Sequence, residues 1–433
     1  MNSSSESEQE FVLESQESED YPLSAVPTDV RKSFWSLAPL LMGFTLFTGT
    51  MFAGGLLGSA YRFFPDLLGL IILGSLILGV YAAALGYIAS QTGLSTLLMA
   101  RFSFGNLGSR WVDFLLGFTQ IGWYAWGAAL MAKLLQELAG VPPSLNWLTI
   151  LVFTYLFAST AYIGYRGMDW LSRLAVPAII VLMIWCLVLA GGKVGGWDGL
   201  LAIAPTKPLP LGAALTLIVG TFISGGTQAT NWSRFAKSGN VAVTSTLAAF
   251  GLINGFVIFA GAFCALVYGK DDMVLVMKEQ GLLVWGLILL FLTLWTTMDN
   301  GIYAFSLAGA HMFRTNRRHL LVLGGATVAL VLAWGGIYEQ LVPYLILLGT
   351  FIPPIGGIIM SDYWLYRRGQ FPPLSQQQPA FNWAGIIAYV LASAIAFFLP
   401  GIKPINGIIA AVILYFVLAK IMRPTFEDEG VSE

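Results

Sequence analysis

The strongest constraint in this sequence is a series of long apolar segments that are separated by short polar connections. A membrane-spanning helix needs about 20 mostly apolar residues, and twelve segments meet that requirement. They cover residues 35–59, 67–90, 112–137, 146–165, 170–192, 211–233, 241–268, 282–311, 319–337, 341–361, 381–399 and 402–422. Only 10% of the residues are charged, against about 25% in soluble domains. The sequence therefore predicts an all-α membrane protein with twelve transmembrane helices.

The charged residues predict the orientation of the chain. Residues 1–34 and 423–433 are acidic, and we predict two cytoplasmic tails there, the first of them disordered. An even number of spans places both termini on one side, and that side then holds fifteen of the 22 Lys and Arg residues. Lys and Arg are enriched in cytoplasmic loops, so we expect a multi-pass protein of the inner or plasma membrane with both termini cytoplasmic. The net charge of −1 argues against a nucleic-acid partner.

Two spans contain dense Gly, Ser and Thr at mid-depth: residues 43–50, followed by Gly54 and Gly55, and residues 220–227. Irregular backbone inside a membrane usually lines a cavity. The two spans are five apart in order, as expected for inverted repeats whose first helices are broken. We therefore divide the chain into repeat 1 (35–192, spans 1–5), repeat 2 (211–361, spans 6–10) and two extra helices (381–422). Close helix packing through small residues is the alternative explanation.

The third and eighth spans carry polar side chains at helical spacing. Gln120 and Trp123 are three residues apart and share a helix face. A flat indole beside a carboxamide suits a planar heterocycle, although a packed core would also use them. In the eighth span Thr293, Thr296 and Thr297 share a face. Their oxygens could bind a small hard cation, or each hydroxyl could bond to the carbonyl one turn back.

Asp299 is the only acidic residue that we place well inside a span. Intramembrane carboxylates are costly and face a cavity or a partner, so Asp299 is either a coupling carboxylate that carries protons or a structural one. No Gly-x-Ser-x-Gly, His-Glu-x-x-His or phosphate-loop motif occurs. Both cysteines, Cys186 and Cys264, lie in apolar runs, and a disulfide or zinc framework is not supported. We therefore expect no enzyme and no cofactor; a membrane-embedded enzyme would need a converging acid/base or metal set.

Six sequence pieces occur in an order that resembles the nucleobase–cation symporters, most closely their cytosine-permease branch. They are Gly43-Phe44-Thr45 through Met51 to Gly54-Gly55, residues 100–105, residues 119–123, residues 222–227, residues 295–300, and residues 353–357 with Asp362-Tyr363. The resemblance covers roughly residues 25–425. It implies a five-plus-five inverted-repeat fold of twelve helices and a symporter that imports cytosine or a related planar heterocycle by alternating access, coupled to sodium or protons.

The resemblance also implies the roles of particular residues. Trp123 and Phe222 would sandwich the ring of the base, and Gln120, Ser224 and the backbone at Thr221 and Gly225 would bond to its edge. Sodium, the expected coupling ion, would lie between span 1 carbonyls and span 8. Its ligands would come from Gly43, Phe47, Thr293, Thr296 and Thr297.

The chain departs from the cytosine permeases at several of these positions. Those proteins usually have Asn at positions 293 and 298 and Ser at position 221, where this chain has Thr293, Met298 and Thr221. Tyr124 and Trp126 also stand where smaller or different residues are common. The substrate could therefore be another pyrimidine, a purine, a thiamine-precursor pyrimidine or a hydantoin. An amino acid on the same scaffold is a further alternative, although it would require partners for an ammonium and a carboxylate.

Overall fold

The computed structural model describes residues 21, 23–270, 273–315 and 317–422. Within these residues the chain is helical, and the only sheet-like pairing is an isolated bridge between Lys32 and Ala236. The first half contains α2 (Phe34–Thr45), α3 (Thr48–Gly58), η1 (Phe63–Leu67), α4 (Leu68–Thr92), α5 (Thr96–Phe104), α6 (Ser109–Ala139), η2 (Pro143–Leu145), α7 (Asn146–Ile163), α8 (Tyr165–Lys193) and α9 (Gly196–Ala202). The second half contains α10 (Leu211–Gly220), α11 (Ile223–Thr227), α12 (Thr230–Ser233), α13 (Gly239–Thr246), η3 (Leu247–Ile253), α14 (Asn254–Tyr268), α15 (Met273–Glu279), α16 (Leu283–Phe313), α17 (Arg318–Trp334), η4 (Ile337–Gln340), α18 (Leu341–Phe351), α19 (Pro353–Met360), η5 (Ser361–Tyr366), α20 (Trp383–Phe398) and α21 (Lys403–Met422).

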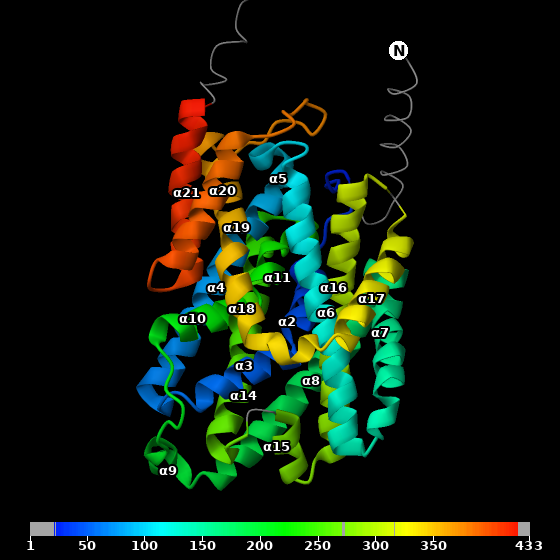
Figure 1. The fold of residues 1–433 in the computed structure, drawn as a ribbon, viewed down its shortest axis with the longest axis vertical. Coiled ribbons are helices and arrows are strands. Elements are labelled where there is room, and N and C mark those ends of the chain that lie inside the picture. Colours follow the sequence, from blue (N-terminus) through cyan, green and yellow to red (C-terminus); the bar gives the residue numbers. More distant parts are fainter. Residues whose placement is uncertain (1–20, 22, 271–272, 316, 423–433) are drawn as a thin grey trace, which may run out of the picture.

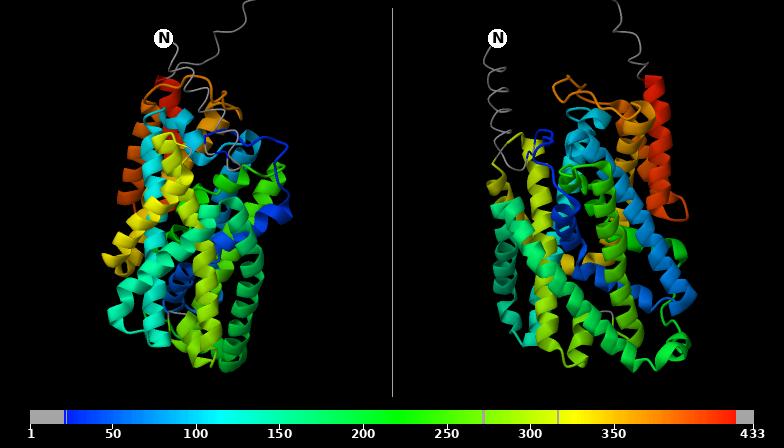
Figure 2. Two further views of the ribbon diagram at one scale, coloured as in Figure 1. Left: turned by 90° about the vertical axis from the view of Figure 1, so that its right-hand side faces the viewer. Right: turned by 180° about the vertical axis from the view of Figure 1, so that it is seen from behind.

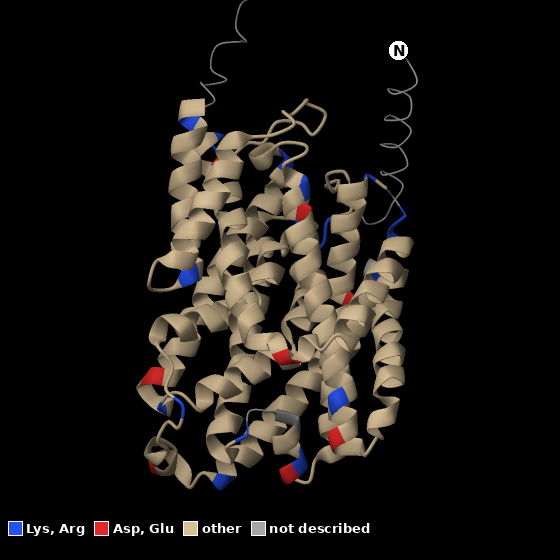
Figure 3. Cartoon of the chain, in the orientation of Figure 1, with Lys and Arg blue, Asp and Glu red and all other residues tan. Residues whose placement is uncertain are grey.

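The helices are consistent with the twelve predicted spans. Among the described residues seven helical stretches are long and apolar enough to cross a membrane, and nine are when each of two bent pairs counts as one span. The other three predicted spans coincide with α6, α17 and α20, of 31, 17 and 16 residues. The first and last described residues lie at the same end of the bundle (Figure 1). Most charged residues lie toward its two ends, with few between (Figure 3).

Both Gly/Ser/Thr-rich spans are broken, as predicted. The helix axes of α2 and α3 differ by 57°, and α10 differs by 55° from the continuation that begins at Ile223. Leu46 and Phe47 leave the helical region between α2 and α3, whereas Phe222 does so between α10 and α11. Gly54 does not belong to the break, because it lies inside α3 and permits close packing. A Cβ on Gly54 would stand 2.2 Å from the Ile258 carbonyl oxygen of α14.

The broken spans pack across the predicted repeats. The half-helix α3 of span 1 lies along α14 of span 7, and α10 and α11 of span 6 lie along α4 of span 2. Each broken span thus packs against the second span of the other predicted repeat, as expected for two inverted repeats that pack against each other. Outside this core α20 and α21 pack on each other, and α21 also contacts α19 (Figures 1 and 2). The boundaries 35–192, 211–361 and 381–422 remain predictions.

The segment ahead of α2 is ordered, so the prediction of a disordered tail over residues 1–34 is wrong for its last part. Val26 is buried, and its N–H donates to the Gly93 carbonyl at 3.0 Å. The Arg31 guanidinium donates to the Ser90 carbonyl at 2.5 Å. Apolar burial and backbone bonding therefore fix this stretch despite the neighbouring acidic residues. Residues 1–20, and the predicted tail at 423–433, lie outside the described residues.

Candidate functional site

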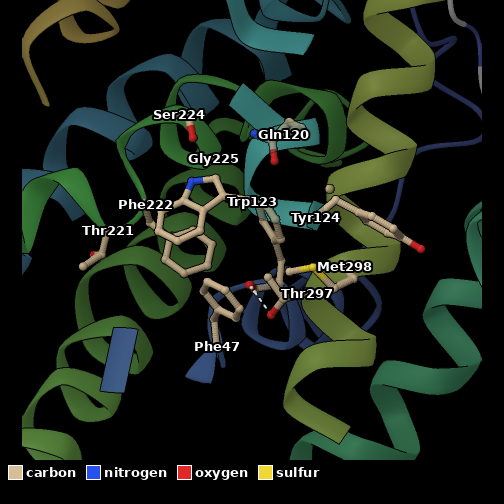
Figure 4. Close-up of a pocket in the computed structure, with 12 residues that line it drawn as sticks. Phe47, Gln120, Trp123, Tyr124, Thr221, Phe222, Ser224, Gly225, Thr297 and Met298 are labelled. Atoms are coloured by element: carbon tan, nitrogen blue, oxygen red, sulfur yellow. Dashed lines mark hydrogen bonds between the residues drawn. The ribbon is translucent and has the colours of Figure 1, made fainter. Parts of the chain in front are cut away.

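The two helix breaks meet in the middle of the bundle. Phe44, near the end of α2, contacts Phe222 with ring centroids 5.2 Å apart and ring planes at 88°. Phe47, in the first break, lies 6.2 Å from Phe222. Span 1 therefore contributes its break to the same region as span 6, and α6 and α16 close the region from the other side (Figure 4).

A cavity lies between these elements. Its lining contains all six residues that we predicted to bind the substrate: Gln120, Trp123, Thr221, Phe222, Ser224 and Gly225. The other six lining residues are Phe44, Phe47, Tyr124, Thr297, Met298 and Gly301. None of the twelve carries a charge, and all belong to the described part of the chain. A site of this composition favours a neutral ligand, because an unpaired charge is costly away from water.

Aromatic side chains form most of the cavity wall. Phe47 contacts Trp123 edge-on, with centroids 5.3 Å apart and planes at 86°, and it meets Phe222 at 87°. Tyr344 of α18 supports the indole of Trp123 from a centroid distance of 5.4 Å. The rings of Trp123 and Phe222 thus both border the cavity, with Phe47 edge-on to each (Figure 4).

Polar groups at the cavity come mainly from α6 and α11. Gln120 is 2% exposed, and its Nε2 has no hydrogen-bond partner among the described residues. A buried donor of this kind is rare and costly in folded proteins, so it is available to a ligand. Ser224 is buried in the first turn of α11. The Thr221 hydroxyl is already used, since it donates to the Ile218 carbonyl at 2.7 Å. The Thr221 N–H is used as well, since it donates to the Leu217 carbonyl at 3.1 Å, so Thr221 can serve a ligand through its carbonyl.

The break in span 1 leaves oxygen atoms beside α16. The Phe47 N–H donates to the Thr45 carbonyl at 3.0 Å and not to the Gly43 carbonyl one full turn back. The Thr297 hydroxyl lies 3.2 Å from the Phe44 carbonyl and 3.4 Å from the Leu46 carbonyl. Carbonyl and hydroxyl oxygens at the C-terminal end of a helix form a suitable environment for a small hard cation.

The other two predicted threonine ligands are placed differently. The Thr293 hydroxyl lies 2.6 Å from the hydroxyl of Thr48, the first residue of α3. The Thr296 hydroxyl donates to the Leu292 carbonyl at 3.0 Å, one turn back in its own helix. The Thr293 hydroxyl also lies 3.0 Å from the Leu290 carbonyl of its own helix. The alternative that the spacing left open thus applies to Thr293 and Thr296 but not to Thr297.

Asp299 is fully buried and does not line the cavity. Its Oδ2 accepts a bond from the Thr160 hydroxyl of α7 at 2.8 Å, and its Oδ1 accepts one from Asn300 at 2.9 Å. The Trp295 indole N–H also reaches Thr160, at 3.2 Å. These contacts connect α16 with α7 and favour the structural role.

Several cavity residues have no ligand role in the sequence prediction. Phe44 entered only as part of a family motif, Gly301 did not enter at all, and Met298 and Tyr124 were singled out only as departures from the family pattern. Gly301 follows Thr297 by one helical turn, so the 3.6-residue period could have identified it. The Tyr124 ring borders the cavity, but its hydroxyl points away and donates to the Thr154 carbonyl (Figure 4).

Comparisons with known proteins agree with this fold and identify the family of the chain. Residues 26–419 match the family described as permease for cytosine/purines, uracil, thiamine, allantoin. The cytosine permease of Escherichia coli (strain K12) is 36% identical over 398 residues, which cover 92% of this chain and 94% of that protein. The hydantoin permease of Microbacterium maritypicum is 23% identical, over 78% of this chain and 76% of that protein.

Solved structures share the fold. A nucleobase-cation-symport-1 family transporter in a closed conformation with bromovinylhydantoin bound matches with a TM-score of 0.78 and 20% identity, over 92% of this chain and 95% of that chain. A Na⁺-coupled sialic acid symporter matches with a TM-score of 0.69 and 12% identity, over 94% and 92% of the two chains. With the extent of the family match, the identity to the Escherichia coli permease and the shared fold, this chain belongs to the permeases for cytosine/purines, uracil, thiamine and allantoin, and is a multi-pass membrane transporter of nucleobase-like solutes rather than an enzyme.

Proposed function

We propose that this transporter imports cytosine or a closely related pyrimidine by sodium-coupled symport. The observation that carries the proposal is the convergence of Trp123, Phe222 and the unpartnered Gln120 amide on one uncharged cavity. Stacking on aromatic faces favours a planar heterocycle, and a carboxamide supplies one donor and one acceptor to adjacent ring groups. The uncharged lining gives no partners for the ammonium and carboxylate of an amino acid.

The base lies between Trp123 and Phe222 in this proposal, with its polar edge toward Gln120. The Ser224 hydroxyl and the backbone of Thr221 and Gly225 supply further bonds to that edge. Along one edge cytosine presents a carbonyl and a ring nitrogen that accept hydrogen bonds and an amine that donates them, so the site must offer donors to the first two groups and an acceptor to the third. A side-chain amide and a hydroxyl meet this need because the amide can be reoriented and the hydroxyl can rotate.

Sodium is the proposed coupling ion, at the break between α2 and α3. The carbonyls of Gly43 and Phe47 and the Thr297 hydroxyl are its proposed ligands. Thr293 and Thr296 contribute through their backbone or by holding Thr48 and α16 in place. Sodium binding then fixes the geometry of the break and, through Phe47, of the aromatic wall. Coupling follows only if sodium and base both favour the same conformation, because each ligand shifts the equilibrium by its differential affinity.

We also propose that both termini lie in the cytoplasm of a cell whose inner or plasma membrane holds the protein. The common position of the first and last described residues and the excess of Lys and Arg at that end support this orientation.

Uptake of labelled cytosine into proteoliposomes tests the proposed function. We expect saturable uptake that a sodium gradient increases, with competition by other bases such as uracil, hypoxanthine, hydantoin and hydroxymethylpyrimidine compared in parallel. Absence of saturable uptake for every base tested would refute the substrate class. Equal uptake after replacement of sodium by choline at fixed pH would refute sodium coupling and leave protons as the coupling ion.

Thr297→Val is expected to weaken the apparent affinity for sodium, measured through cytosine binding, by at least about tenfold. One charge-assisted oxygen contact contributes roughly 1.5–3 kcal/mol to binding. Thr296→Val is the matched control, since the Thr296 hydroxyl bonds within its own helix. The measurement is cytosine binding to purified protein over a series of sodium concentrations at constant ionic strength. Equal sodium affinities for the two variants would contradict the ligand assignment.

Asp299→Asn is expected to lower thermal stability while leaving cytosine affinity within about threefold of the native value. The amide keeps one acceptor oxygen but turns an NH₂ toward one of the donors Thr160 and Asn300, and a mispaired buried group costs about 1–3 kcal/mol. Melting of the purified protein and equilibrium binding separate the two effects. A variant that binds normally but has lost proton- or sodium-driven accumulation would identify Asp299 as a coupling carboxylate instead.

A further inference from the structure

The hydrogen-bonding groups of the cavity are unevenly distributed around it. In the view of Figure 4 Gln120 and Ser224 lie on one side of the Trp123 and Phe222 rings, whereas Met298 and Phe47 lie on the other. The Thr297 hydroxyl is also on the Met298 side, but its proton is donated to the Phe44 carbonyl of the span 1 break. The cavity thus has one polar wall and one wall without a free donor among the described residues.

Met298 is held firmly in the apolar wall. The side chain is 1% exposed, and its sulfur lies 2.5 Å from the position that a Cβ on Gly127 would occupy. The absence of a side chain at Gly127 therefore makes the space in α6 that the thioether fills. A thioether donates no hydrogen bond and accepts only weakly, and its polarisable, unbranched chain packs well against aromatic and methyl groups. The ligand edge that meets Met298 must accordingly be apolar.

We infer that Met298 restricts this transporter to heterocycles with one hydrogen-bonding edge and one apolar edge, that is, to pyrimidines, including those with a small alkyl group at C5. The inference rests on the proposed function and narrows its substrate class. A pyrimidine base with its C2 carbonyl and N3 toward Gln120 and Ser224 turns its C5–C6 bond toward the opposite wall, while its N1–H and its 4-substituent lie at the two sides of the ring. A purine in the same pose turns its imidazole nitrogens there, where they find no strong partner.

The expected discrimination follows from the cost of an unpaired polar group. A buried polar group of a ligand that finds no partner weakens binding by about 10- to 100-fold. A methyl group at C5, by contrast, replaces water or empty space beside a soft apolar side chain and carries no such cost. Purines should therefore bind more weakly than cytosine by that factor, and 5-methylcytosine should bind about as well as cytosine.

Competition for labelled cytosine on the purified full-length protein tests the inference. Unlabelled 5-methylcytosine should compete within about threefold of cytosine, and hypoxanthine should need at least about 30-fold higher concentration. Met298→Asn offers a donor and an acceptor at the apolar wall. This variant should reduce the ratio of cytosine affinity to hypoxanthine affinity by about tenfold, and it should bind 5-methylcytosine more weakly than the native protein does. Met298→Leu, which keeps the wall apolar, should preserve the native order of the three competitors.

Two results would overturn the inference. The first is native protein that binds hypoxanthine as tightly as cytosine or rejects 5-methylcytosine. The second is a folded Met298→Asn variant with the native order of preference. Because the comparison on native protein needs no variant, it decides the question even if Met298→Asn fails to fold. If the protein binds cytosine but the three competitors show a different order of affinities, only the role of Met298 is refuted. If no base binds, the proposed function is refuted.

Discussion

Trp123→Ala is expected to weaken cytosine binding by about 100-fold. Stacking of a base on an aromatic side chain contributes about 1–3 kcal/mol, and the indole also fills the space between Phe47 and Tyr344, at centroid distances of 5.3 and 5.4 Å. Its loss removes the stacking surface and lets neighbouring rings move into the site. The measurement is equilibrium binding of labelled cytosine to purified protein.

Two further variants separate binding from folding in this experiment. Trp123→Phe keeps an aromatic face and should retain most of the affinity. Trp383→Ala removes an indole that is 57% exposed at the start of α20, far along the chain from the cavity residues, and should bind cytosine like the native protein. Near-native affinity of a folded Trp123→Ala variant would show that the base does not stack on this residue.

Gly261→Ala is expected to lower the melting temperature by at least about 5 °C, because overpacking costs about 1–3 kcal/mol or more. A Cβ on Gly261 of α14 would stand 2.1 Å from the Met51 carbonyl oxygen of α3, and backbone cannot rotate away as a side chain can. The new methyl group must therefore push α3 and α14 apart. Thermal unfolding in detergent, followed by intrinsic fluorescence, measures the effect.

Gly324→Ala in α17 is the matched control for this prediction. No atom lies within 4 Å of a Cβ placed there, so the same chemical change should leave the melting temperature unchanged or slightly raised. If the two variants melted at the same temperature, the contact between α3 and α14 would not depend on the missing side chain.

Much of the fold and of the candidate site could be predicted from the sequence, because the features that indicate them lie within single spans. Apolar length identifies each span, and the small residues at 43–50 and 220–227 identify the two breaks. Gln120 and Trp123 follow from helical spacing alone. The family resemblance supplied Phe222, Ser224, Thr221 and Gly225, and the structure places all of them at one cavity.

What could not be predicted depends on contacts between distant segments. The identity of the threonine that faces the span 1 break depends on the rotation of α16, which periodicity does not fix; Thr297 faces it, and Thr296 does not. Gly54 resembles part of a break in sequence, but only the proximity of α14 reveals its packing role. The order of residues 23–33 depends on partners near residues 90 and 235, far along the chain.

The segment ahead of α2 has a mechanical consequence for transport. The Lys32 N–H donates to the Phe235 carbonyl at 2.5 Å, and the Lys237 N–H donates to the Lys32 carbonyl at 2.9 Å. These two backbone bonds fasten the start of the first broken span to the chain just beyond α12, the end of the second. A tilt of either span at this end of the bundle must therefore move the other span or break these two bonds, so the segment ahead of α2 couples the motions of the two broken spans that border the cavity.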